Sequence, residues 1–236
     1  MRQFHAVIFV MDGLLLDTER IALSSFVETC ENFGIGEQTE LFMRCIGTNR
    51  ALGQDVLKEG LQGKVDYLDF ECVWDTKYID CTSNRPIPLK DGTKELLEQL
   101  ASLIIPVAVA TSTDSVRATQ RLRDAGISDK FDAIVGGDQV PNSKPHPDIY
   151  LKAAAILRVS PEKCLALEDS ENGVRSALNA GMTVVQIPDL VQPSPILCSL
   201  GHIILGTLRD VASYAFAPNE QANLSSSGRA EARRST

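Results

Sequence analysis

Several features that would direct the chain to a membrane, a nucleic acid or an oxidising compartment are missing from its sequence. No apolar run approaches the length needed to cross a bilayer, and the N-terminus shows no signal-peptide pattern, so we expect a cytoplasmic protein. The formal charge is -8 at pH 7 and no basic stripe offsets it, which argues against a nucleic-acid partner. The six cysteines form no CxxC pair and no cluster with the three histidines, so we expect reduced thiols.

What the sequence does contain is an alternation of helical and strand patterns. The 236 residues, 44% of them apolar, suffice for one sizeable core and an inserted subdomain. Short apolar runs predict strands and amphipathic runs predict helices. Strands are expected at 5–10, 105–110, 132–135, 164–167, 183–187 and 202–205, with helices at 91–103, 115–125, 146–157 and 172–180. This βαβ order predicts an α/β fold with a Rossmann-like parallel sheet and helices on both faces.

The segment between the first two strands has a different pattern and predicts a second domain. Only helical patterns occur there, and Pro86-Ile87-Pro88 closes the segment. The polar end of the chain has no periodicity and is expected to be disordered. We therefore expect an α/β core from residues 1–16 and 88–216, an inserted all-helical cap from 17–87, and a disordered tail from 217–236.

Polar residues follow three of the predicted strands at their carboxyl ends. These ends meet at one edge of a parallel sheet, where α/β proteins bind ligands. The residues are Asp12 after the first strand, Thr111 and Ser112 after the second, and Glu168 and Asp169 after the fourth. We therefore expect their side chains to share one crevice.

The Glu168-Asp169 pair indicates a magnesium site or a helix cap. Mg²⁺ prefers a few carboxylate oxygens together with water and substrate phosphate. Alternatively, Asp169 or Ser170 caps the helix that follows. Taken alone, such a pair is more often a cap than a metal site.

The Thr111-Ser112 pair and Lys144 indicate a phosphate site. Hydroxyls beside free backbone N–H groups at a helix start can bind an anion, although capping by Thr113 or Asp114 is an equally simple interpretation. Lys144 lies between residues that restrict the backbone, and a fixed ammonium neutralises phosphoryl oxygens. A single loop lysine is otherwise usually solvated.

Four of these segments together resemble one family. Residues 8–18 resemble the first motif of the haloacid dehalogenase superfamily, Asp-x-Asp-Gly-x-x-x-Asp-Thr/Ser, and are closest to its β-phosphoglucomutase-like sugar-phosphatase branch. Thr111-Ser112 corresponds to the second motif, Lys144 to Tyr150 to the third, and Leu167 to Gly173 to the fourth. The motifs occur in the right order, and the resemblance extends to about residue 216.

This resemblance implies an aspartyl-phosphate mechanism that depends on Mg²⁺. The first aspartate of the motif attacks phosphorus, and that position is Val10 in this chain. Asp12 would protonate the leaving group and then activate water. Mg²⁺ would be held by the nucleophile, a backbone carbonyl at Asp12, and the carboxylates of Glu168 and Asp169. The phosphate would be held by Thr111, Ser112 and Lys144.

The cap loop of the family reaches the part of the substrate that does not react, and Arg50 falls there. It is expected either to hold substrate hydroxyls or a second phosphate, or to be an ordinary surface arginine. A mutase would resemble the family member that has a histidine in the first cap helix, but that position is Ala22 here. A phosphatase is therefore preferred over a mutase.

Val10 is the one departure from the pattern, and it leaves two hypotheses open. Valine cannot attack phosphorus or bind Mg²⁺, and loss of a covalent nucleophile costs on the order of 10⁶ in turnover. The first hypothesis is an Mg²⁺-dependent phosphatase of small phosphorylated metabolites, expected to be sugar phosphates, that is inactive or severely impaired at this position. The second is a non-catalytic protein on the same fold that binds a phosphorylated metabolite or a protein partner. A monomer is expected in either case.

Overall fold

Strand β1 (Ala6–Phe9) lies in the middle of the sheet because all four of its side chains are apolar and buried. The computed structural model describes residues 4–46, 50–83 and 86–216. In it β1 pairs in parallel with a strand on each side, so that Ile8 is opposite both Ala108 and Ala166. A strand covered on both faces needs a continuous apolar run, which β1 has.

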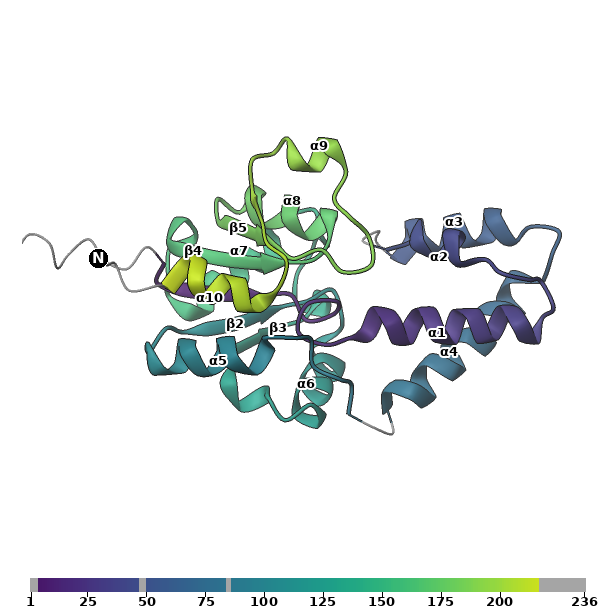
Figure 1. The fold of residues 1–236 in the computed structure, drawn as a ribbon, viewed down its shortest axis with the longest axis horizontal. Helices are drawn as coiled ribbons and strands as arrows, with labels where there is room; N and C mark the ends of the chain where they lie inside the picture. The colour runs from purple at the N-terminus through teal and green to yellow at the C-terminus, as the bar shows by residue number, and fades with distance from the viewer. Residues whose placement is uncertain (1–3, 47–49, 84–85, 217–236) are drawn as a thin grey trace, which may run out of the picture.

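The sheet contains six described strands, all paired in parallel (Figure 1). Their order is β3-β2-β1-β4-β5-β6. Beside β1 these are β2 (Val107–Ala110), β3 (Ala133–Val135), β4 (Cys164–Glu168), β5 (Thr183–Gln186) and β6 (Ile203–Ile204). The expected parallel α/β sheet is thus confirmed, and each strand lies within one residue of a predicted apolar run or inside it.

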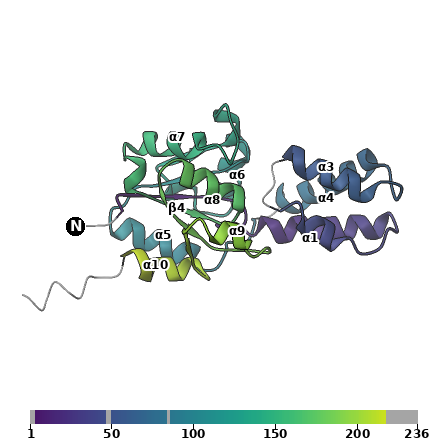
Figure 2. The same ribbon diagram turned by 90° about the horizontal axis from the view of Figure 1, so that it is seen from above.

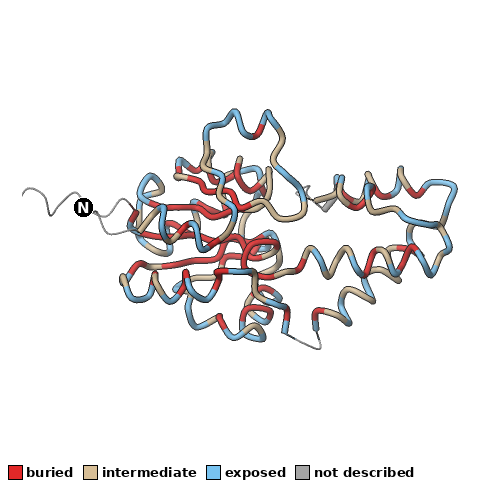
Figure 3. Tube along the Cα trace, viewed as in Figure 1, coloured by how far each residue is buried: buried red, intermediate tan, exposed pale blue. Residues whose placement is uncertain are grey.

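Helices cover both faces of the sheet and bury its side chains (Figures 1 and 3). One face carries α5 (Thr93–Ser102), α6 (Ser115–Asp124) and α10 (Leu208–Phe216). The other carries α7 (Asp148–Leu157) and α8 (Glu171–Asn179), with Leu197 of the short α9 (Pro195–Cys198) at its margin. Short 3₁₀ turns occur at Ser128–Lys130, Gly137–Gln139 and Pro161–Lys163.

Four further helices project beyond the carboxyl ends of the strands (Figures 1 and 2). They are α1 (Thr18–Asn32), α2 (Thr39–Met43), α3 (Arg50–Leu61) and α4 (Tyr67–Ser83). Their apolar side chains form a cluster of their own, centred on Phe26, Phe42 and Phe70. Trp74 packs against this cluster, with its ring 5.3 Å from that of Phe26.

Two linkers connect these helices to the sheet, and backbone hydrogen bonds pair the linkers with each other. The Asp17 N–H donates to the Pro88 carbonyl at 2.9 Å, and the Lys90 N–H donates to the Leu15 carbonyl at 2.9 Å. The two linkers therefore run side by side where the four projecting helices join the sheet.

Two helices, α9 and α10, were not expected from the sequence, and the predicted disordered tail at 217–236 lies outside the described residues. Among the helices that are described, none has the length and apolar character of a membrane span.

Candidate active site

A cavity of about 680 Å³ lies between the carboxyl ends of the strands and the projecting helices α1 and α4. Its walls come from segments far apart in sequence. Val10 and Asp12 follow β1, Thr111 follows β2, and Asp169 follows β4, while Ala22 and Tyr78 face them from α1 and α4. The residues predicted at the strand ends therefore line one space together with residues of the cap helices.

The turn after β1 presents both Val10 and Asp12 to this cavity. The Val10 N–H continues the sheet by donating to the Leu167 carbonyl at 3.0 Å, and its side chain is buried. The chain then turns sharply at Gly13, whose φ of +79° is unfavourable for residues with a side chain. A Cβ at Gly13 would also lie 2.2 Å from the Asp169 carboxylate, so glycine is required for two reasons.

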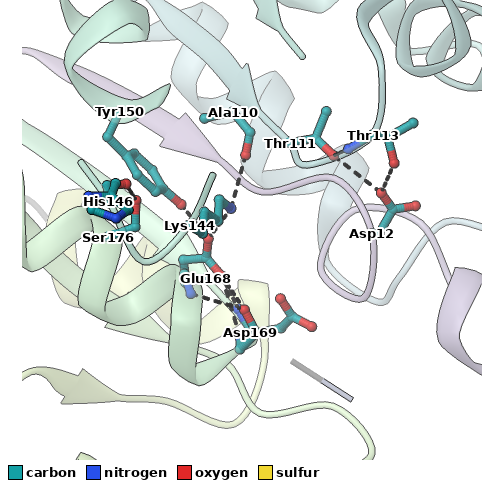
Figure 4. Close-up of polar contacts among 12 residues, drawn as sticks. Asp12, Ala110, Thr111, Thr113, Lys144, His146, Tyr150, Glu168, Asp169 and Ser176 are labelled. Atoms are coloured by element: carbon teal, nitrogen blue, oxygen red, sulfur yellow. Dashed lines mark hydrogen bonds and ion pairs between the residues drawn. The ribbon is translucent and has the colours of Figure 1, made fainter. Parts of the chain in front are cut away.

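The Asp12 carboxylate accepts hydrogen bonds on both of its oxygens, and Figure 4 shows the two that the threonine hydroxyls donate. Oδ2 accepts hydrogen bonds from the hydroxyls of Thr113 at 2.8 Å and Thr111 at 3.2 Å. Oδ1 accepts one from Arg121 Nη1 of α6 at 3.1 Å. The proposed acid–base residue is thus fixed in direction and paired with a buried cation.

The helix that follows β2 begins beside these hydroxyls. Asp114 caps α6 by accepting a hydrogen bond from the Arg117 N–H, as one of the alternative interpretations expected. The Thr113 N–H donates to the Thr111 hydroxyl at 3.1 Å, which tightens the turn. Capping does not consume Thr111 or Ser112, and both line the cavity.

Lys144 is buried and reaches the sheet from the loop before α7. Its ammonium donates to the Ala110 carbonyl at 3.2 Å and to Glu168 Oε1 at 2.5 Å, so it is not a solvated loop lysine. The Tyr150 hydroxyl donates to the same carboxylate oxygen, and burial together with the Glu168 charge raises the pKa of Tyr150 well above its usual value. The other oxygen of Glu168 accepts from the backbone N–H and the hydroxyl of Ser170.

Glycine at position 173 makes room for this buried carboxylate. A Cβ there would lie 2.0 Å from Oε2 of Glu168, closer than any side chain permits. Ser170, rather than Asp169, caps α8, because its hydroxyl accepts from the Gly173 N–H. The side chain of Asp169 is left to face the cavity.

The carboxyl group of Asp169 lines the cavity, in surroundings that disfavour its charged form. Figure 4 shows its carboxylate pointing away from Glu168. Burial, and then the charge of Glu168, raise the pKa of Asp169 well above its usual range. A divalent cation would remove this penalty, and the oxygen donor is the kind that Mg²⁺ prefers.

The described residues do not by themselves complete a metal site. No three His, Cys, Asp or Glu side chains in them are gathered as a ligand set. Glu168 is occupied by Lys144 and Tyr150, and Asp12 by Arg121. This arrangement fits an ion that takes most of its ligands from water and phosphate, with Asp169 as its available carboxylate.

Sequence reasoning assigned no place in the site to several residues that line the cavity, among them Thr113, Arg121, Glu19 and Tyr78. Burial and the charges of Asp12 and Asp189 raise the pKa of Glu19 to about 7. Burial also raises the pKa of Tyr78 to about 12, although the Arg121 guanidinium over its ring opposes this. The only signal for Arg121 was its place next to Leu122 on the apolar face of α6.

Arg50, predicted to contact the substrate, is the first residue of α3, and its side chain lies outside the described residues. Whether Arg50 binds substrate or is an ordinary surface arginine therefore stays a prediction.

The sequence is similar to those of known hydrolases and phosphatases. A model of the haloacid dehalogenase-like hydrolase family matches residues 7–187. A phosphorylated carbohydrates phosphatase from Thermotoga maritima is 37% identical over 182 residues, which cover 75% of this chain and 82% of that protein. A β-phosphoglucomutase from Bacillus subtilis is 32% identical over 188 residues, covering 77% of this chain and 82% of that protein.

A solved structure has the same fold. The crystal structure of a HAD family hydrolase from Deinococcus radiodurans, with bound phosphate and sodium, superposes with a TM-score of 0.78. The sequences are 26% identical, and the match covers 91% of this chain and 96% of that one. Fold, site and sequence therefore agree that this chain belongs to the haloacid dehalogenase-like hydrolase family, whose members are enzymes.

Proposed function

We propose that the cavity is built for Mg²⁺-dependent hydrolysis of phosphate monoesters of small metabolites, chiefly sugar phosphates, and that Val10 leaves the chain inactive or severely impaired. The observation that carries the proposal is the convergence of Asp12, Thr111, Lys144 and Asp169 on one cavity. The relatives named above, a carbohydrate-phosphate phosphatase and a phosphoglucomutase, support a sugar phosphate as the substrate class. We also expect the protein to be cytoplasmic and monomeric and its ligand to be a small phosphorylated metabolite.

Each residue has a role that follows from its contacts. Thr111, Ser112 and Lys144 bind the phosphoryl oxygens, since they offer two hydroxyls and a buried ammonium to the cavity. Asp12, held by the two threonines, is positioned to transfer a proton to or from the leaving oxygen. Glu168 Oε1 positions Lys144 from behind by accepting hydrogen bonds from its ammonium and from the Tyr150 hydroxyl.

A metal ion fits the open side of this arrangement. Asp169, the backbone carbonyl at Asp12 and, less directly, Glu168 would hold it. When bound, Mg²⁺ would offset the charge on the phosphoryl oxygens. The protein contributes the Asp169 carboxyl, whose charged form is disfavoured by burial and by Glu168 and would be favoured by a bound cation.

The presence of Val10 supports a second candidate function for the same cavity, binding without catalysis. Its side chain is buried at the edge of the cavity and supplies neither charge nor nucleophile. The chain as it stands would then bind a phosphorylated metabolite or a protein partner without turnover. A mutase is less favoured, because Ala22, which lines the cavity from α1, cannot take part in proton transfer.

The Val10→Asp variant separates these functions. We expect it to release phosphate from p-nitrophenyl phosphate and from a panel of sugar phosphates in the presence of Mg²⁺. Full recovery would raise turnover on the order of 10⁶ above the parent chain, since that is what a covalent nucleophile contributes. Val10→Asn is the matched control, because it has the shape of aspartate without its nucleophilic oxygen, and it should stay inactive.

Circular dichroism must first show that both variants fold. A folded Val10→Asp protein without phosphatase activity would contradict the phosphatase function and leave the binding function. Rapid turnover by the parent chain would instead show that the nucleophile is not at position 10.

A further inference from the structure

Arg121 is the buried cation of the cavity that the proposed chemistry leaves without a role. It is 8% exposed and lines the cavity from α6, a helix of the core. One of its nitrogens donates to Asp12 at 3.1 Å. Its guanidinium also lies 5.4 Å from the ring centroid of Tyr78, which belongs to cap helix α4.

The guanidinium has more donors than these contacts use. An arginine side chain offers five N–H groups in a planar fork. In the part of the chain that the structure describes, its polar partners are Asp12 and Tyr78. Because Arg121 lines the cavity, its remaining donors are available to an acceptor that enters it.

The proposed phosphate site lies within reach of this fork. Asp12 Oδ2 accepts from the hydroxyl of Thr111 while Oδ1 accepts from Arg121, so a single carboxylate separates the phosphate-binding hydroxyl from the guanidinium. A phosphate monoester presents three charged oxygens, and arginine binds such a group through two parallel hydrogen bonds. The carboxylate is the weaker partner for the same fork, because it carries less charge.

We propose that Arg121 is a substrate-binding residue that exchanges its contact with Asp12 for oxygens of the phosphoryl group of an incoming phosphate monoester. The inference rests on the proposed phosphate-ester function of the cavity. The exchange releases Asp12 from its cation when substrate arrives. The ring of Tyr78 contacts the guanidinium from the cap side and would remain its partner after the exchange.

Calorimetric titration of the parent chain with inorganic phosphate and with glucose 6-phosphate, in the presence of Mg²⁺, tests the proposal. Arg121→Met should weaken both dissociation constants about 10- to 100-fold, since it removes hydrogen bonds between charged groups. Arg121→Lys, which keeps the charge but loses the fork, should weaken them less. Arg123→Met, an exposed arginine on the same helix, should leave them unchanged.

An indirect effect must be distinguished, because loss of Arg121 also leaves Asp12 unpaired and able to repel phosphate. The same substitution is therefore measured in an Asp12→Asn background. Direct binding predicts that Arg121→Met still weakens phosphate affinity about tenfold or more there. An effect that disappears in that background would overturn the proposal and reduce Arg121 to a partner of Asp12.

Phosphate binding by a Lys144→Met variant distinguishes failure of this inference from failure of the proposed function. If Lys144→Met abolishes phosphate binding and Arg121→Met does not, this inference is wrong and the phosphate site stands. If the folded parent chain binds neither phosphate nor glucose 6-phosphate, the proposed function fails and this inference with it.

Discussion

Glu19 lies at the first turn of α1 with its carboxyl between Asp12 and the Asp189 loop. Burial, followed by those two charges, raises its pKa from 4.5 to about 7. The folded protein therefore holds this proton more tightly than the unfolded chain does. Its contribution to stability is complete below about pH 4.5 and is lost as the pH rises to 7.

Replacing Glu19 with Gln should consequently stabilise the protein at pH 8 and change little at pH 5. We expect a gain of about 1–2 kcal/mol at pH 8, or roughly 2–8 °C in Tm, because a buried charge is removed. Thermal unfolding at both pH values, in buffer with EDTA, measures the difference. Glu98→Gln, an exposed position on α5, is the control. A Glu19→Gln protein less stable than the parent at pH 8 would show that the charge is favourable.

The residues of the site differ in how much of their position the sequence could predict. Asp12, Thr111 and Asp169 follow apolar strands directly, and parallel strands bring such ends together. Arg121 and Tyr78 reach the cavity from a helix face and from the cap. Their positions depend on how α6 and α4 pack against the sheet edge, which no local pattern contains.

At the scale of elements, one acidic side chain binds both helix α1 and the linker that returns to the core. Asp189, in the loop after β5, has a side chain that is 4% exposed and accepts from Arg20 of α1 at 2.7 Å and from Lys90 at 2.5 Å. Lys90 belongs to the linker that returns to the core and Arg20 to α1, so Asp189 ties that linker and the first of the four projecting helices to the loop after β5. Orientation of the cap helices therefore depends on this ion cluster.

The variant Asp189→Asn keeps the shape and removes the charge. We expect amide hydrogen exchange at Asp17 and Lys90 to become about 10- to 100-fold faster, since opening of the linkers would cost about 1–3 kcal/mol less. Exchange in β4 should not change. Asp129→Asn, an exposed acid, is the control. Equal acceleration in β4 and in the linkers would mean that the whole protein, rather than the linkers, was loosened.

The elements themselves were predictable where apolar runs are bounded by turns, as β1 to β5 show. Helix α9 has only four residues, too few for a helical period to be visible. Helix α10 has apolar residues at Leu208, Val211, Ala212 and Ala215, but it directly precedes the polar end of the chain, which obscured it. The strand order, with β1 between β2 and β4, is set by pairing that the sequence does not display.

At the scale of the molecule, the apolar residues form separate clusters in the sheet region and in α1 to α4. Phe70 is fully buried in the second region, with its ring 5.5 Å from Phe26 and 5.6 Å from Phe33. Regions with separate cores can unfold as separate units. We therefore expect residues 17–87 to behave as a cap that unfolds independently of the core formed by 1–16 and 88–216.

The Phe70→Ala variant tests this division, because truncating a buried phenylalanine costs about 3–5 kcal/mol. Trp74, the one tryptophan of the chain, packs on Phe26 in the same cluster, so its emission reports unfolding of the cap. We expect its thermal transition to shift downward in Phe70→Ala while hydrogen exchange in β1 and β4 stays unchanged. Leu68→Ala, 70% exposed on the same helix, should shift neither. If tryptophan emission and strand exchange change together, cap and core form one cooperative unit and the linkers transmit stability between them.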